Sequence, residues 1–211
     1  MMYRLCFAAM TFVLSACVSV LPEPTVADAL YRIPVPDPVH VLDTDVLVHE
    51  PDAPRVFAGG EIASEASDGG FRLVPGAEWA DRPTRLLQGV LIDAFDPTGR
   101  GSAFSAPGLS TARLELSWRV VDLHLTEAGA VCRMVVSLHA VDERQMVARE
   151  TVSASRQAPG GGGENRIAAL QSAATDCVDQ TAAFIVRAQT GARERPGDQA
   201  TAVWSFSGTG R

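Results

Sequence analysis

The feature that most constrains this fold is a regular alternation of apolar residues between Leu114 and Ala154. Alternation with a period of two is typical of a β-strand with one buried face. A change of phase within one strand predicts a β-bulge, here near Val120–Val121. The alternating residues of the first strand are Leu114, Leu116, Trp118 and Val120, then in the opposite phase Val121, Leu123 and Leu125.

Two further strands follow this one. In the segment Val131–Val141, one face is formed by Cys132, Met134, Val136, Leu138 and Ala140. Short polar turns, at residues 126–129 and 142–145, separate it from its neighbours, and a third strand is expected over Met146–Ala154. Three strands joined by short turns predict an antiparallel meander.

Two segments have the period of a helix. Apolar residues recur at spacings of three and four over Asp81–Phe95, and Pro83 suits the first turn. A longer helix is expected from Asn165, as N-cap, to Gly191. Short strands are expected over residues 29–35 and 45–49, with weaker candidates over 55–57 and 71–74. The fold class expected is α/β: a single domain with a mostly antiparallel mixed sheet and two main helices packed on it.

Composition excludes some functions. The chain has 211 residues, enough for one domain, and its 18 basic residues, all Arg, against 25 acidic ones give a net charge of −7. Binding to nucleic acid through phosphates needs a basic face, so no nucleic acid partner is expected. No run of 18 or more apolar residues is present, so no conventional transmembrane helix is expected.

The N-terminus has the pattern of a targeting segment. Arg4 is followed by an apolar stretch, Leu5–Leu14, and by Leu14-Ser15-Ala16-Cys17, which resembles the bacterial lipobox. The interpretation is a signal peptide over residues 1–16, with Cys17 acylated on its sulfur and its amine. The alternative is an ordinary signal peptide with Cys17 as a structural thiol. The expected organisation is a tether over 17–28, a domain over 29–191 and a flexible tail over 192–211.

Cleavage before Cys17 leaves Cys132 and Cys177 as the only other cysteines. Both fall on apolar faces, one on a strand and one on the last helix. Since the helix must cover the sheet, contact between them is expected. Two alternatives stay open, a disulfide and two buried free thiols.

We expect no catalysis, no cofactor and no metal. The loop Pro159–Gly163 precedes a helix but lacks the Lys-Ser/Thr of a phosphate-binding loop, so it is interpreted as a connector. His139 has the opposite strand parity from Cys132, which argues against a metal site that includes His124, Cys132 and His139. Ser110, Asp122 and His124 form no triad pattern, because no nucleophile-elbow sequence surrounds any Ser.

The order of these segments resembles the ABC-type transport auxiliary lipoproteins. The similar stretches are the lipobox at Leu14–Cys17, the strand Leu30–Ile33, the segment Ala77–Pro83 with the helix that follows it, the meander from Leu114, and Ala168–Ala173. The Gly-rich loop and the tail depart from the family pattern.

The resemblance implies a non-catalytic accessory role. Such proteins sit at the inner leaflet of the outer membrane, facing the periplasm, and engage a mammalian-cell-entry (MCE) domain protein of an ABC lipid transporter. Self-association into a homo-oligomer stays open. The competing hypothesis is a stand-alone envelope lipoprotein that binds its own ligand or stiffens the envelope. A deep apolar pocket would favour ligand carriage, and a filled core with an exposed apolar patch would favour docking. Trp79 is interpreted either as an exposed partner contact or as a core residue that closes the first helix onto the sheet.

Overall fold

The alternating segments form three long antiparallel strands, as predicted. The structure, a computed structural model, describes residues 27–36, 40–105, 112–142 and 145–194. The three strands are β6 (Leu114–Leu125), β7 (Gly129–Ala140) and β8 (Gln145–Gln157). Val120 pairs with Met134 and Asp122 with Arg133, so Val121 is the extra residue of the predicted bulge. The expected meander is therefore confirmed.

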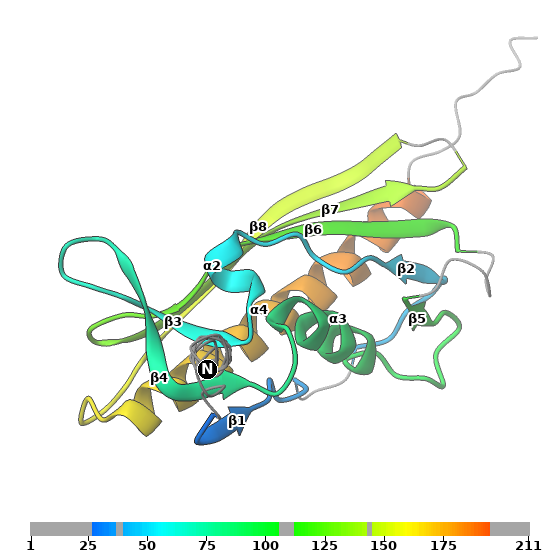
Figure 1. The fold of residues 1–211 in the computed structure, drawn as a ribbon. Coiled ribbons are helices and arrows are strands. Elements are labelled where there is room, and N and C mark those ends of the chain that lie inside the picture. The colour runs from blue at the N-terminus through cyan, green and yellow to red at the C-terminus, as the bar shows by residue number, and fades with distance from the viewer. Residues whose placement is uncertain (1–26, 37–39, 106–111, 143–144, 195–211) are drawn as a thin grey trace, which may run out of the picture.

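Within the described residues, five shorter strands complete an eight-stranded mixed sheet. Figure 1 shows how these strands are arranged. They are β1 (Ala29–Tyr31), β2 (Val46–Val48), β3 (Glu61–Glu65), β4 (Phe71–Trp79) and β5 (Ala103–Phe104). β2 runs parallel to the start of β6, whereas β3 meets its end at Leu125. The strand order is β1-β4-β3-β6-β2-β5, and β7 and β8 continue from the other edge of β6.

The region between residues 55 and 79 differs from the sequence prediction. The expected strand at 55–57 is wrong: Arg55–Ala58 form a single helical turn, α2, in which the Phe57 N–H donates to Pro54 O at 2.8 Å. Pro54 fixes the backbone before the turn. β3 was not predicted, and β4 continues five residues beyond the predicted Val74.

Both expected helices are present. α3 (Pro83–Asp93) begins with Pro83 in its first turn, as predicted. α4 (Gly163–Glu194) begins before Asn165 and continues past Gly191. Asn165 is therefore not the N-cap; its side-chain amide donates to Pro159 O at 2.9 Å and fixes the Gly-rich loop. α4 packs against β7 and β8, and α3 packs against α4.

The described residues between β1 and β2, 32–36 and 40–45, lie along α4 as a strap. Three α4 side chains form hydrogen bonds with the strap. Because these three residues are spaced four apart, they lie on one face of the helix. The contacts are Gln171 Nε2 to Arg32 O at 2.6 Å, Thr175 Oγ1 to Pro34 O at 3.0 Å, and Asp179 Oδ1 to His40 Nε2 at 2.7 Å.

One continuous apolar core joins the sheet to both helices. Leu170, Val178 and Ile185 of α4 are fully buried there, as are Leu116 and Met134 of the sheet. The inner faces of the two layers thus fill the space between them. Among the described helices, none is long and apolar enough to cross a membrane.

Candidate functional site

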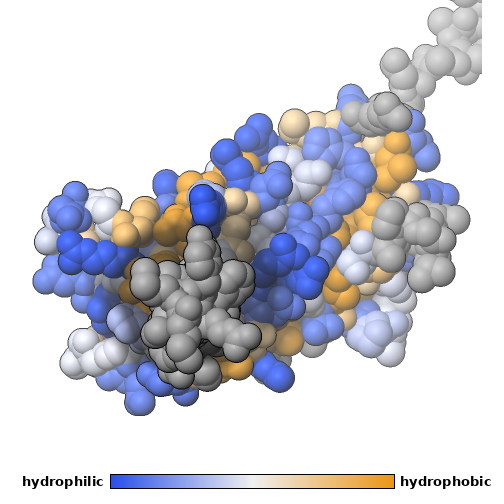
Figure 2. Space-filling model, in the orientation of Figure 1, coloured by the Kyte–Doolittle hydropathy of each residue, from blue (hydrophilic) through white to orange (hydrophobic). Residues whose placement is uncertain are grey.

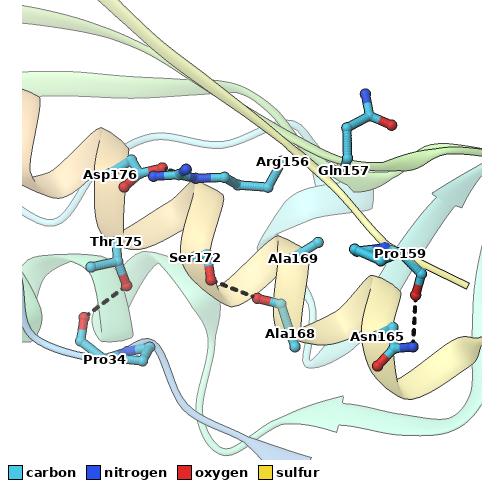
Figure 3. A pocket seen from close by; sticks show the side chains of 10 residues that line it. All are labelled: Pro34, Arg156, Gln157, Pro159, Asn165, Ala168, Ala169, Ser172, Thr175 and Asp176. Atoms are coloured by element: carbon cyan, nitrogen blue, oxygen red, sulfur yellow. Dashed lines mark hydrogen bonds and ion pairs between the residues drawn. The ribbon is translucent and has the colours of Figure 1, made fainter.

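A surface groove runs between the strap, the end of β8 and the first half of α4 (Figure 3). Its volume is about 660 Å³. Small residues of α4 form its floor, because Ala168, Ala169 and Ser172 face it. The complete lining is Pro34, Arg156, Gln157, Pro159, Asn165, Ala168, Ala169, Ser172, Thr175 and Asp176.

Several polar groups of this groove bond to one another, as Figure 3 shows. Arg156 Nε donates to Asp176 Oδ2 at 2.5 Å, and this hydrogen bond raises the pKa of Arg156 above its usual value. The Ser172 hydroxyl donates to Ala168 O at 2.9 Å, and that of Thr175 to Pro34 O at 3.0 Å. Because each of these groups has a protein partner, none of them is placed as a free base or nucleophile.

Cys132 and Cys177 lie together, as their apolar faces predict. Both are fully buried free thiols, and Cys177 Sγ donates to Cys132 O at 3.2 Å. A separate hydrogen bond between the thiol of Cys132 and the side chain of Cys177, together with burial, raises the pKa of Cys132 well above its usual value. Their proximity is established, whereas the disulfide between them stays a prediction.

Trp79 lies in the core. Trp79 is the last residue of β4, just before α3, and is only 4% exposed. A contact with a partner protein needs an accessible ring, so this burial favours the interpretation as a core residue that closes α3 onto the sheet.

Asp122 and His124 of β6 each lie against protein groups other than one another. Asp122 Oδ2 accepts a hydrogen bond from Arg133 at 2.6 Å. His124 is buried against Phe57, with Nε2 at 3.5 Å from Glu65 Oε2. Ser110 lies outside the described residues. In the part of the chain that the structure describes, no three His, Cys, Asp or Glu side chains gather as a metal site.

A bulge in β4 creates an exposed apolar surface that sequence reasoning missed. Glu61 pairs with Glu78 and Ala63 with Leu73, so the five-residue step along β4 from 73 to 78 opposes a two-residue step along β3. The three extra residues reverse the face of β4, with Gly76 at φ +70°. Consequently Trp79 points into the core, while Phe71 and Leu73 are 42% and 51% exposed. Pro75-Gly76 within a strand was the available signal.

An acidic cleft lies beside this surface, between the β3–β4 turn and the β6–β7 turn. Its volume is about 320 Å³. Glu65 and Glu127 are its two charged residues, and both are exposed. Ala66, Ser67, Thr126 and Ala128 complete the lining.

With this geometry established, the comparisons identify the family. The model of the ABC-type transport auxiliary lipoprotein component matches residues 33–182, more than half of the chain. The chain belongs to this family. The resemblance drawn from the sequence is therefore confirmed, and with it a role as an auxiliary component of ABC-type transport and a place in the cell envelope. A search of curated proteins found no match.

Two solved structures share the fold of this auxiliary lipoprotein. One is protein XCC0632 from Xanthomonas campestris, described with the family model DUF330; it is 19% identical, with a TM-score of 0.66. The match covers 80% of this chain and 97% of that protein. The second, titled an uncharacterized protein, is 17% identical with a TM-score of 0.60, and the match covers 76% and 97% of the two chains. At these identities the likeness supports the fold alone.

Proposed function

We propose that this auxiliary lipoprotein is anchored in the outer membrane through Cys17 and docks the MCE-domain protein of an ABC lipid transporter. The family match supplies the accessory role in transport. The specific partner and membrane come from the family resemblance. The protein would thereby help a lipid conduit, driven by the transporter in the inner membrane, to reach the outer membrane.

The observation that carries docking is the combination of a filled core with an exposed apolar surface on β4. A protein that carries a lipid needs an apolar pocket that encloses most of the ligand. Here the space between sheet and helices holds fully buried side chains such as Leu170 and Leu116. The 660 Å³ groove is open at the surface and contains an ion pair. These features favour an adaptor over the stand-alone ligand-binding lipoprotein.

The length of the tether limits which partners the domain can reach. Residues 18–28 form an eleven-residue tether that reaches at most about 35–40 Å when extended. A domain held this close to the outer membrane meets the transporter only through a partner that crosses the periplasm. An MCE protein anchored in the inner membrane supplies that partner.

We further infer that the protein is not an enzyme. Catalysis by general acid–base or nucleophilic chemistry needs a base within hydrogen-bond distance of the group it activates. Asp122 is paired with Arg133, and the nearest carboxylate contact of His124 is the 3.5 Å approach to Glu65. Neither arrangement supplies such a pair.

Co-purification tests the proposal. The full-length protein, carrying a C-terminal affinity tag, is isolated from cells treated with a cross-linker. The MCE protein is expected in the eluate, together with a smaller amount of the transporter. The docking role is wrong if the MCE protein never accompanies the wild type while the transporter's own subunits are recovered with one another.

A further inference from the structure

We propose that the β4 surface formed by Phe71 and Leu73 and the acidic cleft beside it are one docking site, and that it binds a partner segment in which Arg or Lys adjoins an apolar side chain. This inference rests on the proposed docking function and specifies its surface. Each half of the site has its own support in the structure.

The apolar half is held in place before any partner binds. The Phe71 ring meets Phe57 with ring centroids 5.2 Å apart and His124 with centroids 5.0 Å apart, both edge to face. Phe57 is 4% exposed, so the exposed ring of Phe71 packs against a buried side chain. An aromatic side chain fixed in this way loses little conformational freedom on binding, which is typical of interface anchors. Leu73 extends the same face of β4.

The polar half is acidic. Glu65, the last residue of β3, and Glu127, in the β6–β7 turn, line the same cleft, and no basic side chain lines it. The nearby basic residue Arg72, the second residue of β4, already pairs with Asp68 at 3.4 Å. No ion pair involves Glu127 among the described residues. A cleft with this charge is complementary to a guanidinium or an ammonium group.

Figure 2 shows hydrophobic surface beside hydrophilic surface at the end of the molecule that holds β3 and β4. Phospholipid headgroups carry negative phosphates, which the carboxylates of Glu65 and Glu127 repel. The charge of the cleft therefore favours a protein partner over a membrane surface.

The site is separate from the point where the tether joins the sheet. The Asp28 N–H donates to Gly76 O at 2.8 Å, which fixes the start of the domain on β4. Phe71 lies five residues before Gly76, at the opposite end of β4, where it pairs with Glu65 beside the β3–β4 turn. Anchoring and docking can therefore occur at the same time.

Site-specific photocross-linking tests this assignment in cells. The photoreactive residue p-benzoylphenylalanine replaces Leu73 in the full-length protein, and in a matched control it replaces Met146. Met146 is also a large apolar residue, 48% exposed, but lies at the start of β8. Position 73 is expected to cross-link to the MCE protein, at a peptide with Arg or Lys beside an apolar residue. Position 146 is expected to give no such product.

Affinity measurements with purified full-length protein complete the test. Leu73→Ser removes an apolar anchor and is expected to weaken MCE binding roughly tenfold or more. Glu127→Lys reverses the charge of the cleft and is expected to weaken binding and to reduce its dependence on salt. Met146→Ser is expected to bind like the wild type. Circular dichroism confirms that each variant is folded.

The outcomes distinguish an error in the assigned surface from an error in the proposed function. If the wild type binds the MCE protein while Leu73→Ser and Glu127→Lys bind equally well, the β4 surface is not the docking site and the proposed function stands. If the wild type itself captures no MCE protein, the proposed function fails and this inference fails with it.

Discussion

The side chain of Gln180 on α4 lies along the outer edge of β8 and pairs with both main-chain groups of Ser153. Its Oε1 accepts from Ser153 N at 3.3 Å, and its Nε2 donates to Ser153 O at 3.1 Å. β7 is the only strand that pairs with β8 among the described residues. An unpaired edge of this length is a template for pairing with another chain. Gln180 therefore protects the middle of the edge.

Gln180→Ala is expected to destabilise the protein and to promote self-association. Loss of the two hydrogen bonds should lower the free energy of unfolding by about 0.5–1.5 kcal/mol for each bond. Urea unfolding measures the first effect, and light scattering against concentration measures the second. Gln171→Ala is the matched control, because it removes a bond to the strap and leaves the β8 edge covered. Equal light scattering from both variants would show that Gln180 has no protective role.

Gly76 is expected to be required for the bulge that directs Phe71 and Leu73 outward. With φ at +70°, any residue with a Cβ is strained there, and a Cβ would also meet the Asp28 carboxylate. Gly76→Ala should therefore lower the free energy of unfolding by about 1–2 kcal/mol. Differential scanning calorimetry detects this as a lower Tm.

Gly89 provides the opposite control. It lies in α3, and a Cβ added there would meet no atom within 4 Å. Gly89→Ala is therefore expected to raise the free energy of unfolding by about 0.5–1 kcal/mol. If both substitutions lower stability alike, the backbone argument for Gly76 is refuted.

Local patterns predicted the parts of the fold that depend on few residues. The alternation around Val120 predicted both β6 and its bulge, because the polarity of each residue indicates which face of the strand it occupies. Pro83 marked the start of α3, because proline is favoured in the first turn of a helix. β3 was missed because Glu61–Glu65 is largely polar and lies between two Gly-containing turns, and α2 because a single turn is too short to show a helical period. The length of α4 was underestimated because its many contacts with the sheet outweigh the cost of Gly191 inside a helix.

The candidate site was less accessible to sequence reasoning. Whether Phe71 or Trp79 is exposed depends on the three-residue offset between β3 and β4, which only the pairing reveals. Glu65 and Glu127 are far apart in the chain, and the pairing of Ser64 with Leu125 brings their turns together. The contact between Cys132 and Cys177 was predictable, because both lie on apolar faces that must pack against each other.

We predict that the mature protein isolated from cells contains a Cys132–Cys177 disulfide. The periplasm is oxidising, and the two residues are in contact across α4 and β7. On the chain-entropy model the closed loop would contribute about 4 kcal/mol. Mass spectrometry after alkylation without reductant gives the answer. Two alkylated cysteines beyond Cys17 would refute the bridge.

The reduced protein should lose stability at alkaline pH. The pKa of Cys132 is raised in the folded state, so the folded thiol keeps its proton where the unfolded thiol, with a pKa of about 8.5, has lost it. The stabilising contribution is complete below that pH and declines as pH rises through the folded pKa. Urea unfolding from pH 7 to 10 should show a steeper loss for the reduced wild type than for Cys132→Ala. Parallel curves would contradict the assignment.

Lipidation of Cys17 is expected to determine where the protein resides. Metabolic labelling with a fatty acid should mark the wild type, and Cys17→Ala should lose the label and appear in the soluble fraction. Each buried CH₂ contributes about 0.8 kcal/mol, so several acyl chains hold the protein on the membrane where a single chain would not. Cys132→Ala serves as the control, because it removes a buried thiol and leaves Cys17 intact. Equal labelling of Cys17→Ala and the wild type would exclude Cys17 as the anchor.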